Sequence, residues 1–463
     1  MATSKGGYVS GGFDILKAPN APTITSVTTG IGSASVAFTA PTDVGGGAIT
    51  SYTITAVDES TGASTGATGS ASPITISPGG GTFKIRAAAT NIYGPGRVSQ
   101  YDTGNEIYSG VSLWAWGDGA NGALGDGTVI DRSSPVQVGV LNTWSSVGAG
   151  DYFSVATKAD GTLWSWGFNS TGQLGQNDII SRSSPVQVGA LTTWQVVSSG
   201  FDNTLALKTD GTLWAWGTND RGQVGDGTVY NRSSPVQIGA LTNWYQISAG
   251  RRFNLSTKTD GTLWAWGFGG NGELGASNVI SRSSPVQVGA LTNWAQISAG
   301  NGMAGAVKTD GTLWMWGNNL FGGLGTNNRI YRSSPVQVGA LTDWYRISAG
   351  SLFAASVKVD GTLWTWGQNT QAALGQNDTI SRSSPVQVGA LTNWSQVSAN
   401  GTSCAALRTD GTLWAWGYNG QGRLGDNTTV SKSSPVQVGG LTSWYRVING
   451  VTNGHTLALY GVV

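Results

Sequence analysis

The sequence predicts an all-β protein in which a small N-terminal β-sandwich precedes a seven-bladed β-propeller closed by both ends of its repeat region. Three observations predict this fold class. A unit of 50 residues recurs seven times without an insertion, every unit consists of short apolar runs separated by turn residues, and all 21 tryptophans fall at three fixed positions per unit. This tryptophan content favours packed cores, so the 72 glycines are interpreted as turn residues rather than as a sign of disorder.

The repeat is marked by the motif Trp-x-Trp-Gly. Its first tryptophans are Trp114, Trp164, Trp214, Trp264, Trp314, Trp364 and Trp414. A third tryptophan keeps the same period at Trp144, Trp194, Trp244, Trp294, Trp344, Trp394 and Trp444. Asp210-Gly211 separates the apolar runs 205–208 and 213–216, and this dipeptide predicts a tight hairpin because glycine accepts a positive φ. Four strands without a helix in each unit are typical of a propeller blade.

The two ends of the repeat region predict how the ring closes. The region begins at what would be a third strand, 111–114, and it stops at a second strand, 456–460, with no Asp-Gly hairpin after it. One blade would therefore combine strands from both ends. Such a blade leaves no incomplete sheet whose edge could pair with another chain.

The repeat also carries a family resemblance. The stretch from Asp160 to Gly175, Asp-Gly-Thr-Leu-Trp-Ser-Trp-Gly-Phe-Asn-Ser-Thr-Gly-Gln-Leu-Gly, resembles the repeat of the regulator-of-chromosome-condensation family, as does the strand motif at 454–459. The resemblance covers roughly residues 109 to 463 and implies the propeller fold, but little about function. The strict spacing leaves no room for the inserted wedge of the family's exchange factor, and no extra tryptophans and arginines gather as in its ultraviolet photoreceptor.

Residues 18–106 are predicted to form the sandwich. Strand-like runs occupy 23–27, 35–38, 49–54 and 83–87. With Pro22, Tyr52 and the turn sequence at 91–96, they resemble a fibronectin type III domain. Phe38 stands where that family has a core tryptophan, and Gly81 stands where it has a corner tyrosine. We therefore expect an anchoring tail at 1–17, a fibronectin type III-like domain at 18–106 and the propeller at 107–463.

Composition argues against catalysis and against several partners. The chain has 25 basic and 24 acidic residues, and this low, balanced charge does not predict nucleic-acid binding. Its one cysteine, Cys404, and one histidine, His455, cannot form a clustered metal or hydrolytic site, so we expect no enzyme activity, no metal and no cofactor. The aspartates that precede glycine in each hairpin, and the basic residues at the Arg132 position of each unit, are interpreted as structural. No stretch is apolar and long enough to insert in a membrane.

Comparing the repeats with one another indicates where a partner could bind. Three stretches vary strongly between units: the one after Trp-Gly, the one before Arg-Ser-Ser-Pro and the one after Ala-Gly. Strand direction places these stretches on one face of the ring and the nearly invariant turns on the other. Neutral drift of unconstrained loops is the alternative interpretation. Since aromatic and arginine side chains dominate binding hot spots, the predicted binding residues are Tyr152, Phe153, Phe168, Asn169, Arg221, Arg251, Arg252, Phe253, Phe321 and Phe353.

These observations favour a non-enzymatic virion structural or appendage protein of a bacteriophage, such as a fibre, a spike or a capsid decoration. The absence of an export signal beside adhesion-type modules is the reason, because virions leave by lysis. We expect the N-terminal region to bind other virion proteins and the propeller to bind a host surface glycan or protein, and a homo-oligomer is compatible with the sequence. A bacterial surface adhesin and an intracellular protein-binding propeller of the exchange-factor or inhibitor type are the alternatives.

Overall fold

The chain divides into two units. The computed structural model describes residues 18–30, 32–99, 102–107, 110–140, 143–450 and 454–462. One unit comprises Met1–Val111 with Gly461–Val463, and the other comprises Ser112–Tyr460, so the division lies a few residues after the predicted boundary at 106/107. The predicted tail, 1–17, lies outside the described residues. Within the described ranges, no helix has the length and apolar character needed to span a bilayer.

The N-terminal unit contains two β-sheets with a shared core. One sheet has the strand order β1 (Thr23–Gly30), β2 (Ser33–Thr39), β5 (Ile74–Ile76). The other has the order β4 (Ser64–Gly69), β3 (Ile49–Asp58), β6 (Gly81–Asn91), β7 (Gly94–Val98), with β8 (Asp102–Ile107) also paired to β6. Alternate side chains of both sheets are buried, and Phe38 of β2 packs on Tyr52 of β3 with ring centroids 4.8 Å apart. The alternating pattern in the sequence thus forms a two-sheet sandwich core.

Each complete repeat forms a four-stranded antiparallel sheet, here called a blade. Blade 1 consists of β11 (Trp144–Ala149), β12 (Phe153–Lys158), β13 (Leu163–Gly167) and β14 (Arg182–Gln187). Blades 2 to 6 repeat this order: blade 2 has β15 (Trp194–Ser199), β16 (Asn203–Lys208), β17 (Leu213–Gly217) and β18 (Arg232–Gln237), and blade 3 has β19 (Trp244–Ala249), β20 (Phe253–Lys258), β21 (Leu263–Gly267) and β22 (Arg282–Gln287). Blade 4 has β23 (Trp294–Ala299), β24 (Met303–Lys308), β25 (Leu313–Gly317) and β26 (Arg332–Gln337), and blade 5 has β27 (Trp344–Ala349), β28 (Phe353–Lys358), β29 (Leu363–Gly367) and β30 (Arg382–Gln387). Blade 6 has β31 (Trp394–Ala399), β32 (Ser403–Arg408), β33 (Leu413–Gly417) and β34 (Lys432–Gln437).

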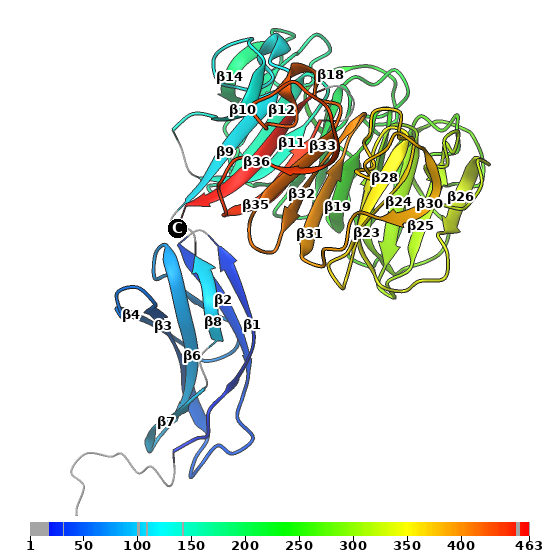
Figure 1. Cartoon of the computed structure of the whole chain (residues 1–463). Helices are drawn as coiled ribbons and strands as arrows, with labels where there is room; N and C mark the ends of the chain where they lie inside the picture. Colours follow the sequence, from blue (N-terminus) through cyan, green and yellow to red (C-terminus); the bar gives the residue numbers. More distant parts are fainter. Residues whose placement is uncertain are drawn as a thin grey trace, which may run out of the picture. The chain divides into compact units, whose positions relative to one another are not determined.

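Blade 7 combines strands from both ends of the repeat region. Its order is β35 (Trp444–Asn449), β36 (His455–Val462), β9 (Gly110–Gly117), β10 (Arg132–Gln137), and Figure 1 shows the cyan β9 beside the red β36. The short 3-10 turns η1 (Ala120–Gly122) and η2 (Gly420–Gly422) lie in loops. The first strands of successive blades contact one another in chain order, and β35 contacts β11. The seven open sheets therefore form a ring, and the predicted mixed blade is observed.

In each blade, one buried tryptophan forms a hydrogen bond to the blade before it in the ring. The indole Nε1 of Trp166, which is fully buried, donates to the backbone oxygen of Ala123 at 2.9 Å. Trp116 closes the series by donating to the Arg423 oxygen at 3.0 Å. The other five donor–acceptor pairs are Trp216–Gln173, Trp266–Gln223, Trp316–Glu273, Trp366–Gly323 and Trp416–Ala373. This bond recurs at every junction between blades.

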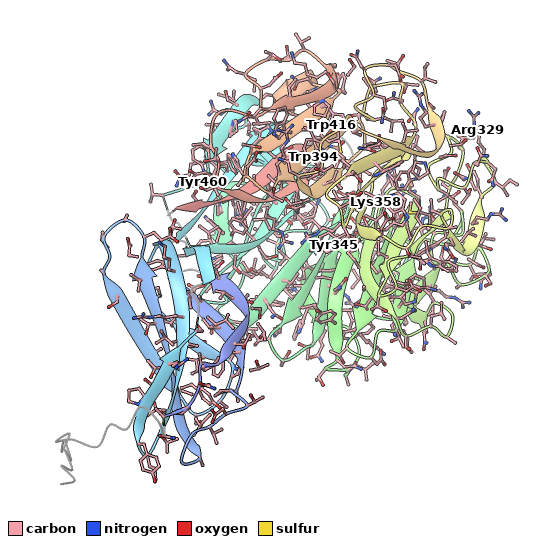
Figure 2. All side chains as sticks on the ribbon, turned by 60° about the horizontal axis from the view of Figure 1, so that its bottom comes forward. Arg329, Tyr345, Lys358, Trp394, Trp416 and Tyr460 are labelled. Atoms are coloured by element: carbon pink, nitrogen blue, oxygen red, sulfur yellow. The ribbon has the colours of Figure 1, made fainter. Side chains whose placement is uncertain are left out.

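The other two tryptophans of each repeat complete a cluster at the hairpin end. Figure 2 shows Trp394 and Trp416 together, with ring centroids 6.3 Å apart. In blade 1 the Lys158 Nζ lies 3.5 Å from the Trp164 ring centroid, and burial lowers the pKa of this lysine. A cation over an aromatic face is attracted to the ring quadrupole, which offsets part of the cost of burying the charge.

The recurring charged residues have local structural roles, as expected. In the Asp-Gly hairpin, Asp160 Oδ1 accepts bonds from the Thr162 hydroxyl and amide at 2.7 and 3.0 Å, and these bonds lower the pKa of Asp160. In five of the seven blades, the basic residue that opens the outer strand pairs with an acid in the loop of its own blade. Such ion pairs join Arg132 to Asp126 at 2.6 Å, Arg182 to Asp178 at 2.7 Å and Lys432 to Asp426 at 3.5 Å.

Substitution of Trp366 tests how much this hydrogen bond between blades contributes to stability. Trp366→Phe leaves the Gly323 oxygen without its indole donor, so we expect a loss of about 1–3 kcal/mol from the unpaired carbonyl, in addition to the lost packing. Trp364→Phe is the matched control, because the indole of this partly buried tryptophan bonds only the Thr362 hydroxyl within its own blade, and the loss of that bond should cost about 1 kcal/mol. Urea unfolding of both variants measures the difference. Equal losses of unfolding free energy in the two variants would show that the bond between blades stabilises the protein no more than the bond within a blade does.

Candidate functional site

The loops of the ring fall on two faces. The loops between first and second strands and between third and fourth strands share one face: in blade 1 the Phe168 amide donates to the Tyr152 oxygen at 2.8 Å. We call this the loop face. The Asp-Gly hairpins and the Gly-Ala-Leu-Thr segments meet at the opposite turn face, where the Trp194 amide donates to the Gly161 oxygen at 3.0 Å. Gly161 has φ +77° and its Cβ would lie 2.1 Å from the Thr192 oxygen, so glycine is required there. The predicted separation of variable and invariant loops is confirmed.

Four of the predicted binding residues are wrong, because their side chains are buried. Phe153, Phe253 and Phe353 are at most 1% exposed and belong to the cores between successive blades. Asn169 is fully buried and holds its own loop: its amide nitrogen donates to the Ile180 oxygen at 3.1 Å, and its oxygen accepts the Leu174 amide at 2.9 Å. These side chains belong to the scaffold, although Phe253 also lies in the wall of the pocket described next.

Three other predicted residues surround one pocket of about 310 Å³ on the loop face. Arg251 and Arg252 line it, together with Phe268, Glu273 and Asn301. The Arg221 guanidinium lies 5.8 Å from the Phe268 ring centroid, at the edge of the same region. We call this the arginine pocket. It joins loops of blades 3, 4 and 5, since Leu352 also lines it.

The remaining predicted residues do not join the arginine pocket. Tyr152 and Phe168 are half-buried in blade 1, where the charges of Asp118 and Arg423 act on the Tyr152 hydroxyl. Phe321 is half-buried in the loop of blade 4. The sequence interpretation missed Phe268, Glu273 and Asn301. Phe268 stands at the same repeat position as Phe168, and Glu273 replaces the glutamine found at Gln173 and Gln223, so comparison between repeats contains a signal for both.

Buried carboxyl groups distinguish this part of the loop face. Burial raises the pKa of Asp202 to about 6, with a further contribution from Asp151, although Arg251 and Arg252 oppose the shift. Burial also raises the pKa of Glu273, whose Oε2 accepts the Asn271 amide at 2.6 Å. Arg251 stacks over the Phe201 ring at 4.9 Å from its centroid. Charged groups held in a partly dry pocket can discriminate between partners, because an unmatched partner leaves them unpaired.

An exposed apolar belt surrounds the loop face. One large apolar side chain in the segment before each outer strand is more than half exposed, and these are Ile130, Ile180, Tyr230, Ile280, Ile330, Ile380 and Val430. Figure 2 shows Arg329, beside one of them, at the outer margin of the ring. The turn face exposes one leucine in each of six blades: Leu191, Leu241, Leu291, Leu341, Leu391 and Leu441. Repeated exposed apolar side chains are a feature of surfaces that bind other macromolecules.

The single histidine and cysteine are in packed positions. His455 is fully buried, its Nε2 lies 2.6 Å from the Ser154 hydroxyl of blade 1, and burial lowers its pKa to about 4. Cys404 is also fully buried, and burial raises the pKa of its thiol. Among the described residues, no three His, Cys, Asp or Glu side chains are grouped so that they could hold a metal ion.

Comparison with known sequences assigns the repeats. The regulator of chromosome condensation (RCC1) repeat matches residues 112–157, 160–207, 210–256, 260–307, 310–357, 360–407 and 410–459. The chain belongs to the RCC1 repeat family. A second sequence model of the RCC1 repeat matches 144–173, 195–223 and 394–423. The expected family resemblance of the propeller is therefore confirmed over all seven repeats, and a comparison with curated protein sequences gives no match.

Solved structures with the RCC1 fold are similar to this chain. Human WBSCR16 aligns with a TM-score of 0.69 and 22% identity, covering 76% of this chain and 99% of that one. Yeast RCC1 (Prp20) bound to Kap60 aligns with a TM-score of 0.68 and 20% identity, over 76% and 89% of the two chains. Prp20p from Saccharomyces cerevisiae gives 0.66 and 19%, over 76% and 92%. At these identities the likeness establishes the fold.

Phe253 and Arg252 are neighbours in the RCC1 propeller, but the first is buried in a core and the second is exposed, so their substitutions should differ in their effect on stability. Phe253→Ala should destabilise the protein by about 3–5 kcal/mol, because it removes a buried ring from the core between blades 3 and 4. Arg252→Ala, at an exposed position, should change stability by no more than about 0.5 kcal/mol. Thermal and urea unfolding measure both. A tolerated Phe253→Ala would contradict the assignment of this ring to the core.

The raised pKa of Asp202 predicts a pH dependence of stability. Because the folded pKa of about 6 exceeds the unfolded value of 3.8, the folded state binds more protons between these values, and stability falls as pH rises through this range. Asp202→Asn should therefore stabilise the protein at pH 7 by on the order of 2 kcal/mol and have little effect at pH 4. Asp220→Asn removes an exposed charge that contributes only weakly to the raised pKa of Asp202, so it should stabilise the protein much less than Asp202→Asn does. Melting temperatures of both variants at pH 4 and pH 7 test this expectation. A variant that is less stable than the parent at pH 7 would contradict the argument.

Proposed function

We propose that this RCC1-repeat chain is a non-enzymatic protein-binding propeller that recognises its partner through the loop face, centred on the arginine pocket. The arginine pocket is the observation that carries the proposal. It combines two arginines, an aromatic ring and the buried carboxyl group of Glu273 in a hollow of about 310 Å³, at a place where the repeats differ from one another, and both arginines also interact with Asp202. Arginine and aromatic side chains at the centre of a surface contribute most of the energy of typical interfaces.

The apolar belt supports a protein as the partner. Its side chains are exposed in all seven blades, and the fold does not need them to be apolar. A protein partner covering the loop face would bury part of this belt and gain about 25 cal/mol per Å² of apolar surface. A small ligand in the arginine pocket would leave the belt exposed. The loop face thus offers a polar centre with an apolar margin.

The solved relatives support the same class of function. The yeast RCC1 structure was determined bound to Kap60, and the study of Prp20p describes binding to Gsp1p and histones. These partners belong to those proteins. They support the expectation that the RCC1 propeller of this chain also binds a protein.

Site-specific photo-crosslinking tests the proposal. A photoreactive residue placed at Arg252 should form a covalent adduct with one protein in an extract of the producing cells, whereas the same residue at Leu291 on the turn face should not. The Arg251→Ala/Arg252→Ala double variant should then bind the purified partner at least about tenfold more weakly, the loss expected for hot-spot side chains. Adducts formed only from position 291, or an unchanged Kd of the double variant, would contradict binding through the arginine pocket.

A virion appendage is the second candidate. It is favoured by the separate N-terminal unit, whose two packed sheets with buried Phe38 and Tyr52 support a fibronectin type III-like sandwich. In this role the N-terminal unit would bind neighbouring virion proteins and the propeller would bind a host surface glycan or protein. Mass spectrometry of particles purified from lysed cultures tests it, since a structural protein stays with the particle through density-gradient purification.

A further inference from the structure

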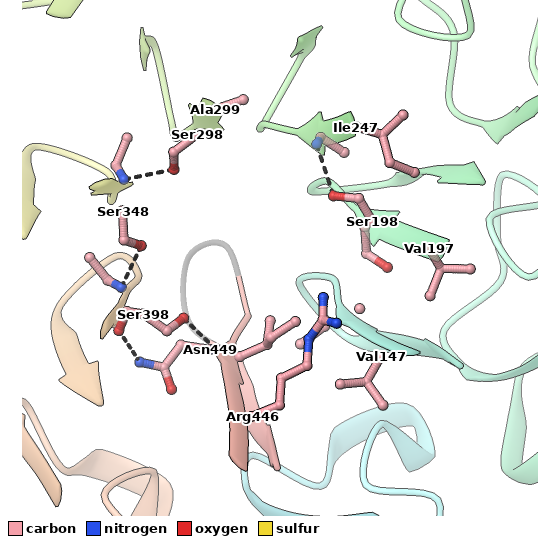
Figure 3. A pocket seen from close by; sticks show the side chains of 18 of the residues that line it. Val147, Val197, Ser198, Ile247, Ser298, Ala299, Ser348, Ser398, Arg446 and Asn449 are labelled. Carbon is pink, nitrogen blue, oxygen red and sulfur yellow. Dashed lines mark hydrogen bonds between the residues drawn. The ribbon is translucent and has the colours of Figure 1, made fainter. Parts of the chain in front are cut away.

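The centre of the ring contains a channel whose wall carries both polar and apolar side chains, the latter including Val147, Val197 and Ile247. The cavity encloses about 180 Å³ and is lined by the first strands of the blades, with Ser198, Ser298, Ser348, Ser398 and Asn449 among its lining residues. Figure 3 looks into this channel and shows hydrogen bonds that cross from one blade to the next. None of its lining residues is an aspartate or a glutamate.

The serine hydroxyls line the channel in a defined orientation. Each accepts the backbone amide of the following blade: Ser198 Oγ from Ala249 at 3.0 Å, Ser298 Oγ from Ala349 at 2.9 Å and Ser398 Oγ from Asn449 at 2.9 Å. Ser348 accepts the Ala399 amide in the same way, at 2.9 Å. A hydroxyl that accepts a backbone amide keeps its own proton to donate. The channel wall therefore offers several O–H donors at one level.

Arg446 adds a positive charge to this wall. Its side chain extends from β35 into the channel, as Figure 3 shows. Within the described part of the chain, its guanidinium makes no hydrogen bond and no ion pair. Burial lowers the pKa of Arg446, and the nearby positive charge of Arg346 acts in the same direction. The side chain of Arg446 remains partly exposed within the channel, and a cation without a counter-charge in a confined cavity attracts anions.

Comparison between blades shows that the fold does not require arginine here. The same repeat position holds Gln296 and Gln396, and both clamp the following blade. Gln296 Oε1 accepts the Ile347 amide at 2.8 Å while its Nε2 donates to the Ile347 oxygen at 3.1 Å. Gln396 bonds Val447 in the same manner, at 3.2 and 3.3 Å. Arg446 makes no such pair of bonds to blade 1. Compared with the glutamines of blades 4 and 6, arginine at this position lacks a bond between blades and leaves its guanidinium free in the channel.

We propose that the channel is a binding site for a small inorganic oxyanion of the size of phosphate, held by the Arg446 guanidinium and by the hydroxyl protons of the channel serines. A guanidinium presents several N–H donors in a planar fork that matches an oxyanion, and hydroxyl donors complete its coordination. A cavity of about 180 Å³ accommodates such an ion but not a nucleotide. The bound anion would neutralise the channel charge and bridge blade 7 to its neighbours. This site is independent of the arginine pocket.

The test compares inorganic phosphate with chloride at equal ionic strength. Phosphate should raise the melting temperature of the wild-type protein, and calorimetric titration should give a saturable Kd. Arg446→Gln places in blade 7 the residue that blades 3, 4 and 6 already hold, so it should fold, and its affinity for phosphate should fall at least tenfold. Arg329→Gln, which removes an exposed arginine at the outer margin of the ring, is the control and should retain the phosphate effect.

A crystallographic measurement complements the variants. Wild-type crystals soaked in selenate should show an anomalous peak within hydrogen-bond distance of the Arg446 guanidinium. An equal phosphate effect in the wild type and both variants would overturn the proposal, because it would indicate a general salt effect. Failure of phosphate to stabilise the wild type, or a selenate peak elsewhere with none in the channel, would overturn it as well.

Discussion

The structure depends on one bond that is repeated around the ring. A fully buried indole in each blade donates to a backbone carbonyl of the blade before it, and the Trp116–Arg423 bond completes the series. The indole supplies a large buried surface and a directional donor in the same side chain. Gly175 shows how tightly this arrangement is packed: with φ +71°, its Cβ would lie 2.8 Å from the Trp216 Nε1. The close approach of neighbouring blades thus requires glycine opposite the buried tryptophan.

The fold could be predicted because its determinants repeat. The tryptophan spacing occurs seven times and the Asp-Gly hairpin six times, and together they predict the blades and their strand order. The split ends of the repeat region occur once and predict the mixed seventh blade. The sandwich core was also accessible, because alternation along β2, β3 and β6 is preserved in the burial of their side chains.

The site was less predictable because a variable position is not always an exposed one. Phe153, Phe253 and Phe353 alternate with Asn203, Met303 and Ser403 at the same repeat position, and this variety suggested a recognition surface. The position in fact lies in the packing between blades, where neighbours compensate for changes in volume. Arg251 and Arg252 line a pocket on the loop face, but their association with Phe268, Glu273 and Asn301 depends on how loops of different blades meet. The spacing of residues within one repeat does not show which loops of different blades will contact one another.

The mixed seventh blade also bears on how the protein is made. As the chain is synthesised from its N-terminus, β9 and β10 emerge early and must wait for β35 and β36, which follow the strands of six complete blades. During that interval β9 is an unpaired edge beside apolar side chains, and the junctions next to blade 7 cannot form. Folding of the first six blades can proceed locally, whereas ring closure joins residues more than 300 positions apart, such as Trp116 and Arg423. The seventh blade and its two junctions are therefore the last parts of the ring that can form.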